Sequence, residues 1–191
     1  MAQNSIDPQR VITGVVTLSF PHLFEKYSND PDKEPKYSTM ILVDKSDTAT
    51  VEAIVAAQQA ALEAGKDTKF SGKVPKVWRN TFRDGDDEGD LEKQPELAGK
   101  FFMTISSNQK PQIVDHQRNF VEDPEEAYPG RKARVSMRAF PFSNSGNKGV
   151  SFGLNNVQLL SHGPRLGGGR TSALDEFDEF EVDDEGVDML S

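Results

Sequence analysis

Residues 131–142 read RKARVSMRAFPF, and residues 150–160 read VSFGLNNVQLL. In the first segment small apolar residues alternate with polar or charged ones, and a β-strand sends successive side chains to opposite faces. The two segments are joined by residues 143–149, SNSGNKG, which are typical of a turn. The sequence therefore predicts a β-hairpin whose first strand has an apolar face and a cationic face that ends in aromatic residues.

The cationic face of this hairpin consists of Lys132, Arg134 and Arg138, followed by Phe140 and Phe142. Cations and aromatic rings on one surface suit a nucleic acid, which offers phosphates to the cations and bases to the rings. A strand with three cations on one face is, however, most often only solvated. The hairpin alone leaves both interpretations open.

A second segment, residues 74–83 (VPKVWRNTFR), also interleaves cations with aromatic residues. In an extended conformation Lys76, Trp78 and Phe82 would share one face, and Arg79 would lie on the other. Trp78 is explained equally well as a core residue and as a platform for a base. We include Lys76, Trp78 and Arg79 among the candidate nucleic-acid-binding residues.

Short strands dominate the rest of the chain up to residue 162. Apolar patterning predicts strands over residues 10–20, where Pro21 ends the strand, and over residues 37–43, 101–107 and 112–115. One helix is predicted from Asp47, its N-cap, to residue 64, with Gly65 just beyond it. This pattern favours a mainly β fold, an antiparallel barrel of five or slightly more strands with one packed helix.

The acidic residues are concentrated in the C-terminal part. The chain has 22 basic and 31 acidic residues, and nine of the acidic ones lie within residues 173–191. Residues 163–172 are glycine-rich and predict a flexible linker, and the tail that follows is too acidic to fold alone. We therefore expect a folded domain over residues 1–162, a linker and a disordered acidic tail. The tail residues that we expect to contact a partner protein are Phe177, Phe180, Asp183, Asp184, Met189 and Leu190.

No signature of an enzyme is present in the sequence. The chain has no cysteine, and its three histidines are isolated, so neither a catalytic triad nor a metal site is expected. The acidic loop that begins at Asp84 does not fit a calcium-binding loop, because its twelfth residue is Pro95 and not glutamate. No apolar run is long enough to span a membrane and no signal peptide is evident, so we expect a cytoplasmic protein without a cofactor.

Several short motifs occur in order between residues 11 and 160. They are LSFPHLF at residues 18–24, RDGD at 83–86, YPG at 128–130 and GLNNVQL at 153–159. Together they resemble a phage-encoded family of single-stranded DNA-binding proteins that was first catalogued as a domain of unknown function. The resemblance implies an OB-fold. The acidic tail is similar to the C-termini of bacterial and phage single-strand binders, which dock onto partner proteins.

The resemblance implies sequence-independent binding of single-stranded DNA during phage DNA replication or recombination in a bacterial host. The tail would recruit phage or host replication or recombination proteins, and it would compete with DNA for the cationic face. Two alternatives stay open: an acidic adaptor or DNA mimic without DNA affinity, and, with less support, a magnesium-dependent nuclease built on the Asp84 loop. The sequence does not decide whether the chain forms a homo-oligomer.

Overall fold

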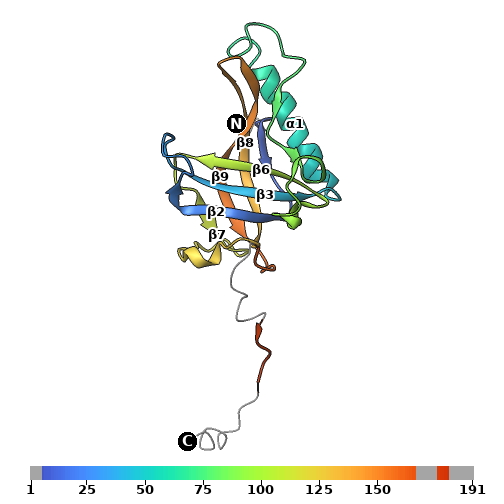
Figure 1. Ribbon diagram of the computed structural model, residues 1–191. Helices are drawn as coiled ribbons and strands as arrows, with labels where there is room; N and C mark the ends of the chain where they lie inside the picture. Colours follow the sequence, from blue (N-terminus) through green and yellow to red (C-terminus); the bar gives the residue numbers. More distant parts are fainter. Residues whose placement is uncertain (1–5, 167–175, 181–191) are drawn as a thin grey trace, which may run out of the picture.

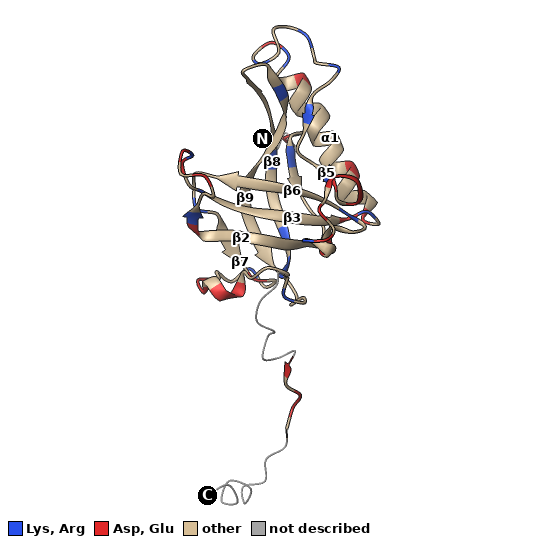
Figure 2. Cartoon of the chain, viewed as in Figure 1, with Lys and Arg blue, Asp and Glu red and all other residues tan. Residues whose placement is uncertain are grey.

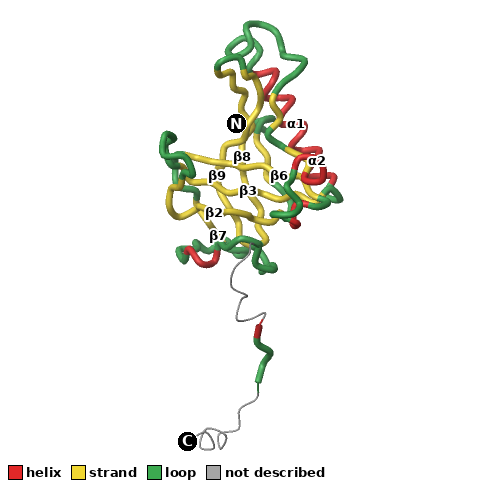
Figure 3. The backbone as a smooth tube through the Cα atoms, viewed as in Figure 1, coloured by secondary structure: helices red, strands yellow, loops and turns green. Residues whose placement is uncertain are grey.

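The computed structural model describes residues 6–166 and 176–180, and their fold is mainly β (Figure 1). The strands form the body of the molecule, and most loops gather at its two ends (Figure 3). The helical elements are α1 (Thr48–Ala64), α2 (Gly85–Glu88) and two 3₁₀ turns, η1 (Pro95–Leu97) and η2 (Pro124–Glu126). The strands are β1 (Arg10–Ile12), β2 (Val16–Tyr27), β3 (Lys36–Asp44), β4 (Arg79–Asn80), β5 (Arg83–Asp84), β6 (Lys100–Ser107), β7 (Gln112–Val114), β8 (Lys132–Asn144) and β9 (Asn147–Leu159).

Five strands close into a barrel in the order β8, β2, β3, β6, β9, and the ring is completed because β8 also pairs with β9. All these pairings are antiparallel except that of β6 with β9, which is parallel and joins Ser106 to Gly153. A small five-stranded barrel of this kind is the architecture of an OB-fold. The predicted fold class is therefore confirmed, and the remaining short strands extend the sheet beyond the ring.

The alternation of β8 decides which side of the hairpin faces the core. Ala133, Val135, Met137 and Ala139 are all buried, as the sequence predicts. They join one core cluster with residues from the other barrel strands, of which Leu18 is an example at 0% exposure. Burial of apolar surface of this kind is the main force that closes the barrel.

α1 packs against β8 and β9 with its alanine-rich side. The Asp47 side chain accepts a hydrogen bond from the Thr50 backbone N–H and so caps the helix, and the helix ends at Gly65, as predicted. Ile54 and Leu62 are buried against the core. The helix thus supports the hairpin from one side, which is visible beside β8 in Figure 1.

The N-terminal strand differs from its prediction. The structure breaks it at residues 13–15, and β2 then continues through Pro21 to Tyr27. The break arises because Gly14 approaches α1, where its N–H donates to the Thr50 hydroxyl at 2.9 Å. Pro21 is tolerated because the pairing of β2 with β3 is irregular between Ser19 and His22, and a proline at such a bulge loses no ladder hydrogen bond.

Residues 74–83 are also not the single extended segment that the sequence predicts. Strand pairing is confined to β4 and β5, because the Asn80 side chain forms a turn by accepting a hydrogen bond from the Phe82 N–H at 2.9 Å. Phe82 is buried while Lys76 is exposed, so these residues do not share a face. Trp78 is partly buried and packs against the core.

The acidic loop after β5 is held by a lysine. Lys45 Nζ lies 2.6 Å from an Asp84 carboxylate oxygen and 2.7 Å from one of Asp86. These contacts and the hydrogen bonds to Lys45 lower the pKa values of both aspartates. Gly85 has no room for a side chain, since a Cβ atom there would lie 2.1 Å from the Leu97 carbonyl oxygen. The RDGD motif therefore has a structural role in this loop.

Candidate nucleic-acid interface

The outer face of β2, β3 and β6 is hollowed by three adjoining cavities. The central cavity, of about 820 Å³, lies between the loop of residues 28–35 and the outer side chains of β3 and β6. It shares Phe20 and His22 with a cavity of about 610 Å³ near η2, and it shares Met40 and Thr104 with one of about 620 Å³ near β4. Together the three form one continuous depression, which we call the groove.

The groove lies where the fold places a nucleic-acid ligand. β3 and β6 are the second and third strands of the barrel ring, and the loop of residues 28–35 joins the first strand to the second. In OB-folds this strand face and this loop are the elements that bind oligonucleotides. The fold and the shape of the surface therefore indicate the same site.

Phe20 is the most unusual residue of the groove. Its side chain is 53% exposed, and its backbone φ is +45°, in the left-handed region that non-glycine residues rarely adopt. Such a conformation costs on the order of 1–3 kcal/mol and is found most often at functional sites. The backbone irregularity of β2 thus places an aromatic ring at the wall shared by two of the cavities.

His22 and Tyr27 add a second aromatic surface. Their rings stack with centroids 4.0 Å apart and an interplanar angle of 11°. Burial lowers the pKa of His22 below its ordinary value of 6.5, so the imidazole is neutral near pH 7. The pair therefore presents flat, uncharged rings to the groove, and such rings are suited to stacking on bases.

Cations surround these aromatic residues without filling the groove. Lys33 and Lys36 line the central cavity and are exposed. Arg79 and Arg83 line the cavity near β4, where Arg83 lies over the Phe102 ring at 5.0 Å. Arg165 lines the cavity near η2. Figure 2 shows the basic residues distributed along the loops and strand ends, where they can reach phosphates on either side of a bound strand.

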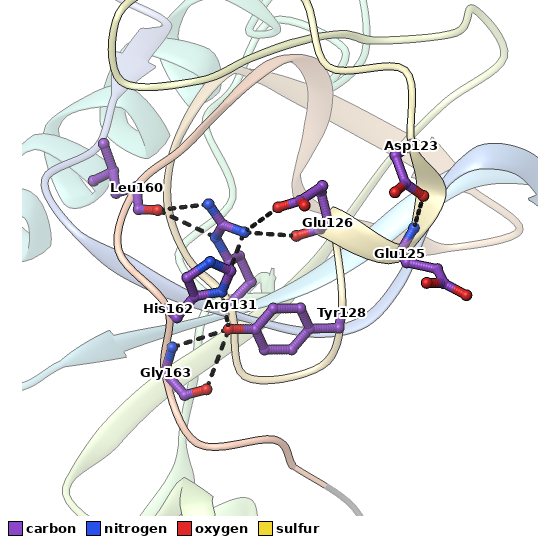
Figure 4. A network of polar contacts seen from close by, with 8 residues as sticks. All are labelled: Asp123, Glu125, Glu126, Tyr128, Arg131, Leu160, His162 and Gly163. Atoms are coloured by element: carbon purple, nitrogen blue, oxygen red, sulfur yellow. Dashed lines mark hydrogen bonds and ion pairs between the residues drawn. The ribbon is translucent and has the colours of Figure 1, made fainter. Parts of the chain in front are cut away.

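The end of the groove near η2 is held in place by a polar network (Figure 4). Arg131 is 7% exposed, pairs with the Glu126 carboxylate at 2.8 Å and donates to the Leu160 carbonyl oxygen. The Tyr128 hydroxyl lies 2.8 Å from His162 Nδ1 and accepts a hydrogen bond from the Gly163 N–H. The network fixes the Tyr128 ring as a wall of the groove and holds residues 160–163 against the barrel.

The family model for the single-stranded DNA-binding protein of Enterobacter phage Enc34 matches residues 9–187. The chain belongs to this family. The solved structure of the Enc34 protein is 23% identical, with a TM-score of 0.68 over 89% of this chain and 90% of that one. The Enc34 protein in complex with single-stranded DNA is likewise 23% identical, with a TM-score of 0.66 over 84% and 90% of the two chains. The bacteriophage T7 single-stranded DNA-binding protein gp2.5 is 17% identical, with a TM-score of 0.59 over 91% and 97%.

Membership in the Enc34 family confirms the resemblance drawn from the sequence and the expectation of a binding protein in place of an enzyme. The chain has no significant match among curated protein sequences. Within the described part of the chain, no helix combines the length and the apolar character needed to cross a membrane.

The cations of the β8 face are where the sequence places them, on the outer side of the strand, but each has a partner within the protein. Lys132 Nζ donates to the Thr17 hydroxyl at 2.6 Å, and Arg134 Nε donates to the Thr13 carbonyl oxygen at 3.0 Å. Arg138 pairs with Asp7 at 2.7 Å. These contacts exist because β1 and the start of β2 both pair with β8 and bring the N-terminal segment alongside it. None of the three cations lines the groove.

The other predicted residues are scattered. Of the eight predicted DNA-binding residues, all of them described, Arg79 is the one that lines the groove. Phe140 is 41% exposed on the β8 face, Phe142 is partly buried near the turn of the hairpin, and Trp78 packs on the core. Among the predicted tail residues, Phe177 and Phe180 are exposed, and Asp183, Asp184, Met189 and Leu190 lie outside the described residues.

Sequence reasoning missed Phe20, His22 and Tyr27. All three lie in β2, and the first two belong to the LSFPHLF motif. Proline was taken as the end of the strand, which placed the following residues in a loop. The available signal was the density of aromatic residues on both sides of Pro21, because a loop has no need of several rings in a row.

Proposed function

We propose that this Enc34-family protein binds single-stranded DNA in the groove, without preference for base sequence. The observation that carries the proposal is the pair of aromatic surfaces, Phe20 and the stacked His22 and Tyr27, on the ligand-binding face of an OB-fold. The family supports it, since the Enc34 relative has been solved in complex with single-stranded DNA.

The chemistry of binding follows from the two kinds of residue. Every base has a flat π-face, so a ring at Phe20 stacks on any base and contributes on the order of 1–3 kcal/mol. Exposed Lys33 and Lys36 on one side and Arg79 on the other contact phosphates, which are the same for every sequence. Affinity in this arrangement depends on salt far more than on sequence.

The proposal uses the groove in place of the β8 face. Lys132, Arg134 and Arg138 already have oxygen partners, and phosphate would have to displace these contacts. Lys33 and Lys36 have no ion-pair partner among the described residues, so they are available to a ligand. The groove therefore binds a strand with less rearrangement.

The wider role that we propose is the coating of single-stranded DNA during phage replication or recombination in the cytoplasm of the host. The nine acidic residues of the tail favour two further functions, recruitment of a replication or recombination protein and competition with DNA for the basic residues. Arg165 lines the groove and Leu166 donates from its backbone to the Pro129 carbonyl oxygen at 2.9 Å, so the chain leaves the barrel beside the groove.

The two alternative functions have less support. An adaptor without DNA affinity would have no need of exposed aromatic rings in a groove. A magnesium-dependent nuclease would need the carboxylates of the Asp84 loop, but Asp84 and Asp86 are occupied by Lys45. In addition, the described residues contain no group of three His, Asp or Glu side chains placed to hold a metal ion.

Fluorescence anisotropy with labelled single strands of two unrelated sequences tests the proposal. We expect similar affinities for both, and a double variant, Lys33→Gln with Lys36→Gln, whose plot of log K against log[salt] is shallower by about 1.4, at about 0.7 for each phosphate contact. Arg10→Gln with Lys93→Gln removes two exposed cations elsewhere and is the matched control. No binding, or an equal effect in the control, would contradict the proposal, and cleavage of the strand in magnesium would favour the nuclease.

A further inference from the structure

A group of basic residues lies outside the barrel, at the end of the molecule that carries the turn of the β8–β9 hairpin (Figure 2). It is made by residues 65–79, which follow α1, and by residues 143–149 of the hairpin, and we call it the basic lobe. These segments contain six basic residues and one acidic residue, Asp67, a net charge of +5. The six are Lys66, Lys69, Lys73, Lys76, Arg79 and Lys148.

The basic lobe is a folded part of the structure. Phe70 is 2% exposed and belongs to the main core cluster. The backbone N–H groups of Lys69 and Phe70 both donate to the Gly65 carbonyl oxygen, at 2.8 and 3.1 Å, and the Gly72 N–H donates to that of Lys66 at 2.7 Å. The lysines are therefore held on a fixed backbone, and binding a ligand there requires little ordering of the chain.

The charge of the lobe is not neutralised by neighbouring carboxylates. As far as the structure describes the chain, none of the six cations forms an ion pair, whereas Lys45, Arg131 and Arg138 each bind an acidic side chain. Clustered charges of one sign repel each other and attract a polyanion. The lobe exposes little aromatic surface, since Phe70 is buried and Trp78 is partly buried. It suits phosphates and not bases.

The groove and the lobe meet at Arg79. This residue lines the cavity near β4, and its backbone pairs with Gly149 at the base of the hairpin. The two backbones are in close contact, because a Cβ atom on Gly149 would lie 2.4 Å from the Arg79 carbonyl oxygen. A strand that passes Arg79 therefore meets the lysines of the lobe next.

We propose that single-stranded DNA leaves the groove at Arg79 and continues across the basic lobe, which binds its phosphates and leaves its bases free. This inference rests on the proposed binding of DNA in the groove. An acidic polypeptide has the same charge, but the continuity through Arg79 favours the DNA strand. The acidic tail of the same chain begins at the opposite end of the barrel, where residue 166 lies (Figure 1).

The test compares two lengths of oligonucleotide on the full chain, a strand of about 5 nucleotides that fills the groove and one of about 20 that reaches the lobe. The lobe variant is Lys69→Gln, Lys73→Gln and Lys76→Gln, and the matched control is Arg10→Gln, Lys93→Gln and Arg118→Gln, which removes three exposed cations from other surfaces. All substitutions are at exposed positions, and circular dichroism verifies that both variants are folded.

We expect the lobe variant to bind the short strand like the wild type and the long strand more weakly. For the long strand its salt slope should fall by about 2, so that a fourfold rise in salt costs the wild type about 20-fold more affinity than the variant. Unchanged binding of the long strand, or an equal loss for both lengths or in the control, would overturn the path across the lobe. Wild-type protein that fails to bind the short strand would instead refute the groove.

Discussion

Replacing Phe20 with alanine separates a DNA-stacking ring from a structural one. About half of the side chain is already exposed, so only about 1 kcal/mol of the 1.5–3 kcal/mol that a fully buried phenylalanine contributes is lost from folding. The stacking energy of one base is larger, roughly 1–3 kcal/mol, which is a loss of about 5- to 150-fold in affinity for single-stranded DNA. The variant should therefore fold and bind poorly.

The matched control is Phe140→Ala. Phe140 is 41% exposed, similar to Phe20, but it lies on β8 outside the groove. Anisotropy titrations and urea denaturation of both variants give affinity and stability for the same proteins. We expect similar small losses of stability and a loss of affinity in Phe20→Ala alone. A folded Phe20→Ala protein that binds like the wild type, or a larger loss in Phe140→Ala, would refute the groove and favour the β8 face.

Three further predictions concern pH and the tail. Because burial lowers the pKa of His22 in the folded state, the unfolded state takes up its proton first, and stability should fall as pH drops through 6.5; His22→Gln should reduce this dependence in urea denaturation at pH 7.5 and 5.5. Asp84 and Asp86 have lowered pKa values, so the stability that they contribute with Lys45 should be present above about pH 4 and disappear below it, and Lys45→Met should flatten the acid limb of a thermal-stability profile. Deletion of residues 173–191 should tighten single-strand binding at low salt and have less effect as salt rises; equal affinity of both forms at low salt would show that the tail does not compete.

The features that could be predicted from the sequence are those set by local patterns. The alternation at Ala133, Val135 and Met137 fixes the inner face of β8, and the cap at Asp47 fixes the start of α1, since neither depends on distant residues. Motifs such as GLNNVQL identified the family, and with it the barrel.

The location of the groove could not be obtained in this way. The Arg138 side chain is exposed and cationic in the sequence pattern, but its partner, Asp7, is 131 residues away and is brought there by the pairing of β1 with β8. Conversely, the loop of residues 28–35 and Arg79 become neighbours of β2 and β6 only when the barrel closes. Which cations are already paired is a property of the tertiary structure, and the sequence pattern contains no information on it.

The conformation of Phe20 is itself an argument for a ligand in the groove. A left-handed backbone is disfavoured for a large side chain, and glycine or asparagine would adopt it at lower cost. The ring does not recover this cost by burial, because 53% of it remains exposed. Both the strain and the exposed apolar surface therefore oppose folding, and neither is required to close the barrel, since Leu18 and Leu23 already anchor β2 in the core. An aromatic ring held at this position against its local preference is best explained by a flat partner that covers it, and a base of single-stranded DNA has that shape.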